Sequence, residues 1–219
     1  MSEILLALKT VAAAAAVVAA SGALGVRWWA GRERWHRRAG WLFCAAMVVL
    51  ALAWLASAAV AASPMRAVAA LLLLYPAGSG LGHARRGDRP PGWPEAVAAW
   101  SLLLLGVGLF VWGTRAMLVD EAVLAGLGWL GLATLAVILA GPDVRSQFTT
   151  EEDRGPARVV NHLAMMLAGT FAALTSLLIT LAPTQFAIIG TILALFVAVH
   201  LMVHWSSRVL GHGLPPRRE

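Results

Sequence analysis

Residues 41–60 of the chain read WLFCAAMVVLALAWLASAAV, a run of twenty residues without a charged side chain. A helix needs about 20 predominantly apolar residues to cross the roughly 30 Å hydrocarbon layer of a membrane. Similar apolar runs begin near Ile4, Met65, Ala96, Ala122, Val159 and Phe186. The sequence therefore predicts an all-α, polytopic membrane protein with seven transmembrane helices.

Composition supports the same fold class over the whole chain. Hydrophobic residues make up 60% of the 219 residues and charged residues 13%, and the mean hydropathy is +0.77. Soluble domains of this size have about twice that charged fraction. We expect residues 1–219 to form a single transmembrane helical domain surrounded by membrane lipids.

Basic residues predict the orientation of the spans. All but three of the 17 Lys and Arg residues fall within 27–38, 85–89, 145–158 and 208–218, which lie between alternate spans or after the last one. Short loops rich in Lys and Arg stay in the cytoplasm. The pattern predicts the N-terminus outside and the C-terminus in the cytoplasm of a bacterial inner membrane. It also accounts for the net charge of +6, so no nucleic acid partner is indicated.

The first apolar run could be taken for a secretory signal. A signal peptide begins with a positively charged region, whereas this chain begins with Glu3 and carries Lys9 inside the apolar run. We therefore expect a first membrane span that is retained.

Histidines give the main indication of chemistry. Five of the six can be placed at the cytoplasmic end of the predicted bundle: His36, His83, His162, His200 and His204. Neutral imidazole is the commonest protein ligand of metals and also an axial ligand of haem. The shared depth predicts a site for haem b or for a divalent metal such as zinc, near the cytoplasmic face.

Within this set, His162, His200 and His204 are the preferred cofactor ligands. His200 and His204 are four residues apart, so both rings lie on one face of a helix. His162 begins a stripe of small and polar residues, which lets helices approach closely in lipid and should face the bundle interior. The alternative is that His204 lies at the membrane interface, His200 bonds a neighbouring helix and His162 ends a packing seam.

A second polar stripe is formed by Tyr75, Ser79 and His83, again at intervals of four. It could line a pocket or form a hydrogen-bond seam between helices, and the seam is favoured. His36 and His83 each lie close to arginines, which favours a solvated position at the level of the lipid headgroups. All carboxylates fall in tails, loops or helix ends, so a proton-coupled carrier with a mid-membrane acid is disfavoured.

Two hairpins suggest an internal repeat. Residues 35–86 and 161–218 each contain two predicted spans, with a histidine near the start and Leu-Gly-His near the end. A parallel repeat of this kind would bring histidines from four helices to one side of the membrane.

One motif set resembles a known family. Trp35-His36-Arg37-Arg38-Ala39-Gly40, Arg85-Arg86-Gly87-Asp88, and Asn161-His162 followed by Met165-Met166 and Gly169-Thr170-Phe171 resemble a family of uncharacterised bacterial multi-pass proteins with a domain of unknown function. The resemblance draws attention to His36 and His162, the positions of its His-Arg-x-x-Gly and its histidine before a Met-containing span. It implies no activity.

The pair His200-x-x-x-His204 looks like the last-helix pair of seven-helix zinc hydrolases of the ceramidase and adiponectin receptor type. Those enzymes also have Ser-x-x-x-His on the second helix and an acidic residue on the third, and this sequence has neither feature on the corresponding helix. The resemblance implies a zinc-dependent hydrolase acting on a lipid.

Three functions follow from these observations. The leading hypothesis is a haem- or metal-binding protein with a redox partner or a lipophilic ligand. The second is the zinc-dependent lipid hydrolase, and the third is a non-catalytic accessory or structural subunit. No catalytic residue is assigned by the sequence.

Overall fold

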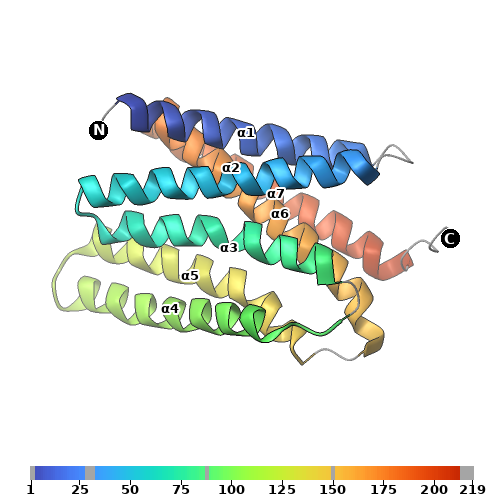
Figure 1. Ribbon diagram of the computed structural model, residues 1–219. Coiled ribbons are helices and arrows are strands. Elements are labelled where there is room, and N and C mark those ends of the chain that lie inside the picture. Colours follow the sequence, from blue (N-terminus) through green and yellow to red (C-terminus); the bar gives the residue numbers. More distant parts are fainter. Residues whose placement is uncertain (1–2, 28–32, 87–88, 149–150, 213–219) are drawn as a thin grey trace.

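The computed structural model describes residues 3–27, 33–86, 89–148 and 151–212 of the chain, and these residues form seven helices (Figure 1). They are α1 (Glu3–Arg27), α2 (Glu33–Val60), α3 (Pro64–Arg86), α4 (Trp93–Leu118), α5 (Val123–Ser146), α6 (Glu151–Leu181) and α7 (Thr184–His212). Each predicted apolar run lies within one of these helices, so the all-α fold class is confirmed.

The helices make the chain a multi-pass membrane protein. Among the described residues, the six helices α1 to α6 contain segments long and apolar enough to cross a membrane. In α7 the described apolar segment is the shorter Ile189–His204. Six spans are therefore supported, whereas the seventh span and the orientation of the bundle stay predictions.

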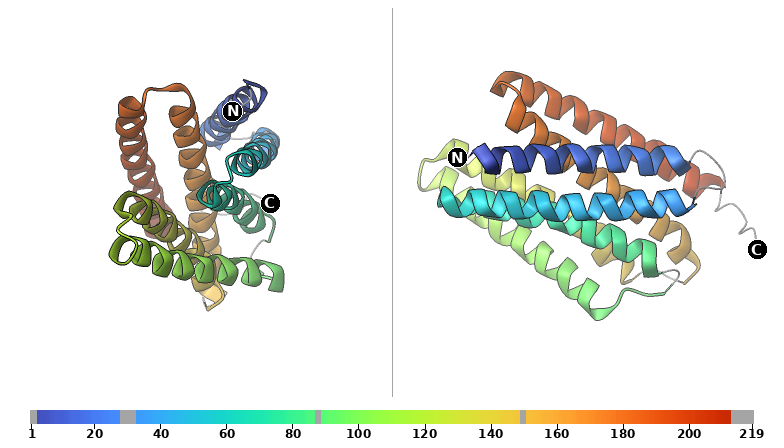
Figure 2. Two further views of the ribbon diagram at one scale, coloured as in Figure 1. Left: turned by 90° about the vertical axis from the view of Figure 1, so that its left-hand side faces the viewer. Right: turned by 45° about the horizontal axis from the view of Figure 1, so that its top comes forward.

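The helices are arranged around α3 and α6, which pack against each other. The antiparallel pair α1 and α2 lies on one side of them, and the pair α4 and α5 lies on the other (Figure 2). Helix α7 packs on α6. The pairs α2–α3 and α6–α7 are both hairpins of contacting helices, but the predicted duplication of residues 35–86 in 161–218 stays a prediction.

Small residues bring the helices close together. On α1, Ala13 and Ala16 are fully buried against a cluster that includes Phe43 and Met47 of α2. In α4 and α5, a Cβ atom on Gly113 would stand 3.0 Å from the carbonyl oxygen of Gly126, so a larger residue would push the two backbones apart. Such contacts replace the hydrophobic effect as the cause of helix association in lipid.

One polar cluster lies inside the packing of α1, α2 and α6. Lys9 is only 4% exposed, and its Nζ lies 4.1 Å from the ring centroid of Trp54. Trp54 Nε1 donates to Ser176 Oγ at 2.8 Å. The ammonium is thereby stabilised by an aromatic face, and three helices are joined.

The other polar cluster lies at the opposite end of the bundle. There α3 and α5 end and α4 and α6 begin (Figure 1). Because consecutive helices run in opposite directions, this is also the end that carries most of the arginines. The candidate site lies here.

Candidate functional site in a groove between α3 and α4

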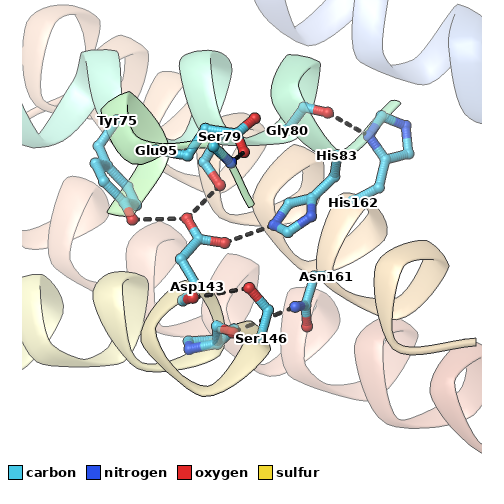
Figure 3. A network of polar contacts seen from close by, with 11 residues as sticks. Tyr75, Ser79, Gly80, His83, Glu95, Asp143, Ser146, Asn161 and His162 are labelled. Atoms are coloured by element: carbon cyan, nitrogen blue, oxygen red, sulfur yellow. Dashed lines mark hydrogen bonds and ion pairs between the residues drawn. The ribbon is translucent and has the colours of Figure 1, made fainter. Parts of the chain in front are cut away.

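Three side chains of α3 converge on one carboxylate of α5 (Figure 3). Tyr75 Oη donates to Asp143 Oδ2 at 2.6 Å, and Ser79 Oγ donates to the same oxygen at 2.5 Å. His83 Nε2 lies 2.5 Å from Asp143 Oδ1. Residues four apart share one face of a helix, which explains how Tyr75, Ser79 and His83 all reach the same partner.

The network is shielded from solvent. The side chain of His83 is 3% exposed and that of Asp143 13%. A buried carboxylate needs hydrogen-bond donors or a counter-charge, and Asp143 needs them more because it lies in the last turn of its helix, where the helix dipole disfavours an anion. The α3 stripe meets that need, while Ser146 Oγ donates to the carbonyl of Asp143 at 2.8 Å.

The network borders a groove with a volume of about 540 Å³. Among the described residues, α4 packs closely on α5 alone, so α3 and α4 stand apart over the buried cluster that contains Leu72 and Leu102. The walls are largely apolar, and the polar residues gather towards one end. The lining comprises Leu71, Leu74, Tyr75, Gly78, Ser79, His83, Pro91, Pro94, Glu95, Ala98, Ser101, Leu102, Leu105, Asp143 and Ser146.

Glu95 adds a second carboxylate at the polar end. It is the third residue of α4, and its Oε2 accepts a hydrogen bond from the backbone N–H of Gly92 at 2.9 Å, as in a capping box. Its Oε1 would stand only 2.8 Å from a Cβ atom on Gly82. The absence of a side chain at Gly82 therefore lets the start of α4 approach the end of α3.

These contacts correct one sequence expectation and refine another. His83 is not a solvated residue at headgroup level, because it is buried against Asp143. The stripe that it shares with Tyr75 and Ser79 is both a hydrogen-bond seam to α5 and part of a groove wall. Asp143 had no role in the sequence interpretation, since it was grouped with the carboxylates at helix ends.

Of the predicted ligands, His36 and His162 come together. Their ring centroids are 6.4 Å apart and the rings are nearly perpendicular. Each Nδ1 pairs with a backbone carbonyl of another helix, His36 with Ala23 at 2.9 Å and His162 with Gly80 at 2.8 Å. The inward stripe on α6 is confirmed, because Ala173 and Ser176 are buried.

His200 and His204 form a separate stacked pair on α7, with ring centroids 6.2 Å apart. Their common face is confirmed, but both side chains are exposed. The five predicted ligands are thus found as the pair His36–His162, the pair His200–His204, and His83 bound to Asp143. Among the described residues, no three His, Cys, Asp or Glu side chains are grouped so that they could hold one metal ion.

The chain matches no family model, no curated protein and no solved structure. The two family resemblances carried by the histidine motifs stay resemblances.

Proposed function

We propose that this protein binds an amphiphilic molecule from the membrane in the groove between α3 and α4. The observation that carries the proposal is a hydrogen-bonded carboxylate, Asp143, at the polar end of an otherwise apolar groove. Ligand sites are typically apolar clefts of 300–1,000 Å³ with a few convergent polar groups. Ionisable residues inside membrane helices are costly and usually functional.

The groove is accessible from the side of the bundle. Leu71 and Leu74 on its α3 wall are 52% and 36% exposed, and Ala98 and Ser101 on its α4 wall are exposed as well. A chain-bearing molecule dissolved in the bilayer can therefore enter between the helices. Its apolar part would lie along the leucines and its polar end against the Asp143 network.

The polar end is suited to exchange hydrogen bonds with the ligand. A carboxylate that holds an imidazole fixes the orientation of the ring, as in the Asp–His pair of hydrolytic triads. Tyr75 and Ser79 hold Asp143 in place. His83 and Asp143 are thus the groups through which this site would exchange hydrogen bonds with the polar end of the ligand.

The test is photo-crosslinking of the purified protein in lipid nanodiscs with a hexadecanol that carries a diazirine. We expect labelling of the groove walls, within 71–83 and 91–105, that excess unlabelled hexadecanol removes. Gly78→Leu should reduce the competed labelling about tenfold, because the new side chain would enter the groove, where a Cβ atom on Gly78 meets nothing within 4 Å.

The control is Gly131→Leu, the same change on α5 outside the lining residues, where a Cβ atom likewise meets nothing within 4 Å. It should leave labelling unchanged. Labelling that spreads evenly over the helices, or that Gly78→Leu leaves intact, would show that the groove binds no amphiphile and would refute the proposal.

A second proposal keeps the metal or haem centre for His36 and His162. Metal-binding histidines usually donate their other ring N–H to a carbonyl or carboxylate, which fixes the ring, and both residues have such a carbonyl at Nδ1. A bound haem would supply electron transfer, and a metal would supply Lewis acidity. A visible spectrum and metal analysis test this, with loss expected in His162→Ala and in His36→Ala but not in His200→Ala.

The remaining sequence hypotheses gain less support from the geometry. A catalytic zinc usually has three protein ligands, and the described residues offer no such group. A lipid would still fit the apolar groove. The lipid substrate of the hydrolase hypothesis is therefore kept, whereas its zinc is not. An accessory subunit would be favoured if neither the crosslinking nor the metal experiment gave a positive result.

A further inference from the structure

Helix α7 lies at the outer edge of the bundle (Figure 2). Among the described residues it packs closely on α6 alone. The side towards α6 carries small residues: a Cβ atom on Gly190 would stand 3.0 Å from Leu178 Cδ1, and Ala194 and Ala198 are partly buried. Another side of α7 therefore faces away from the bundle.

An exposed seam runs along that other side, which we call the α7 seam. Its side chains follow one another at alternating intervals of three and four residues: Phe186, Ile189, Leu193, Phe196, His200 and Val203. This is the spacing of the a and d positions of a coiled coil, which lie on one side of a helix. Residues 186–203 extend about 27 Å, close to the thickness of the hydrocarbon layer. The seam is long enough to pack against a second membrane helix over a whole span.

The hairpin of α6 and α7 indicates the depth of His200. The two helices are antiparallel, and Met165 lies 16 residues before the end of α6 while His200 lies 16 residues after the start of α7. Met165 is seven residues inside the α6 span, which begins at Arg158, or about 10 Å along the helix axis. The apolar segment of α7 likewise continues to His204. His200 is thus at the level of the apolar helices.

At this depth, His200 distinguishes the α7 seam from a surface that lipid covers. Apolar side chains pack against lipid tails as well as against protein, whereas ionisable residues within membrane helices almost always face protein or water. The side chain of His200 is exposed on the seam, and its ring stacks on that of His204 with centroids 6.2 Å apart. An imidazole so placed indicates that protein covers the seam.

We propose that the α7 seam binds the α7 seam of a second copy of this chain, with the two His200 side chains paired across a two-fold axis along the membrane normal. About such an axis the same helix of each copy runs parallel to its counterpart, so each seam residue faces itself. A neutral imidazole has one N–H donor and one acceptor nitrogen, which allows two identical residues to bond each other. A single polar residue at an a position also fixes the register and the number of helices.

The first test is cysteine crosslinking of the full chain in lipid vesicles. The single native cysteine is removed by Cys44→Ala, and one cysteine at a time is then introduced on α7. We expect Leu193→Cys and Phe196→Cys to form disulfides between copies, because each faces its own counterpart. Leu195→Cys and Val199→Cys, which are exposed on another side of α7, should form few.

The second test measures the dissociation constant of the dimer by single-molecule photobleaching as the protein is diluted in vesicles. We expect His200→Ala and Leu193→Ala each to raise this constant about tenfold. Leu195→Ala is the matched control, because it removes the same side chain from another exposed side of the helix. It should leave the constant unchanged.

This inference does not depend on the groove between α3 and α4, so the two proposals can fail separately. A protein that stays monomeric at every density, or disulfides that form mainly at Leu195 and Val199, would refute the interface. A dissociation constant unchanged in His200→Ala would refute the histidine pair. Crosslinks of the seam to a different protein, without any between copies, would refute the second copy as the partner.

Discussion

Helix α4 has two neighbours, and the interfaces differ in kind. Towards α5 it is closed by glycines, with Gly106, Gly113 and Gly126 at positions where added Cβ atoms would press on the facing helix. Towards α3 it leaves a groove of about 540 Å³ bordered by the Asp143 network. Glycines thus bring α4 and α5 into close contact, whereas α4 approaches α3 closely at its start, near Gly82. The open space beyond that point is where we propose that an amphiphile binds.

The largest loss of stability should come from separating α4 and α5. In Gly126→Leu the Cβ atom alone would stand 2.8 Å from the carbonyl oxygen of Gly113, so α4 and α5 must separate. We expect the free energy of unfolding, measured by denaturant titration in detergent, to fall by about 3 kcal/mol. The same substitution at Gly131, which meets no neighbour, should cost less than about 0.5 kcal/mol. Equal stabilities would show that the α4–α5 contact does not hold the pair together.

A smaller loss of stability is expected from breaking the hydrogen-bond network of Asp143. Asp143→Ala leaves the donors of Tyr75, Ser79 and His83 without their acceptor. Because unsatisfied donors inside a membrane protein are costly but can find other partners, we expect a loss of about 2 kcal/mol in the same titration. Asp120→Ala, an exposed carboxylate at the other end of the bundle, is the control. A stability unchanged in Asp143→Ala would mean that the network does not join α3 to α5.

The smallest loss of stability is expected from removing a single hydrogen-bond donor to Asp143. Tyr75→Phe removes one hydroxyl from Asp143 and keeps the ring in the groove wall, so the loss should be about 1 kcal/mol. Thr114→Val is the comparison, because its hydroxyl bonds the carbonyl of Phe110 within α4. If both variants lost the same amount, the bond of Tyr75 to Asp143 would add nothing beyond a local contact.

Much of the fold could be predicted because lipid imposes simple requirements. A span must be long and apolar, which identified the run at 41–60 and its counterparts. The small and polar stripe after His162 correctly indicated the buried face of α6, since Ala173 and Ser176 are in the core. Length, apolar composition and the position of small residues are properties of single helices, so each can be predicted from the sequence of that helix alone.

The site could be predicted only in part, because it depends on which helices are neighbours. The spacing of Tyr75, Ser79 and His83 showed a common face but not that the partner is Asp143, which lies 60 residues beyond His83. Likewise, shared depth placed five histidines at one end but did not give their positions around the bundle. The structure pairs His162 with His36, while His200 pairs with His204.

The buried ammonium of Lys9 has a practical consequence. Lys9 is the sole lysine of the chain, and it lies under the ring of Trp54 between α1, α2 and α6. An amine-reactive reagent can modify this side chain only while α1 is detached from its neighbours, so the rate of modification counts such openings under native conditions. The chain thus contains its own reporter of how often the α1 side of the bundle comes apart, independent of any ligand at the other end.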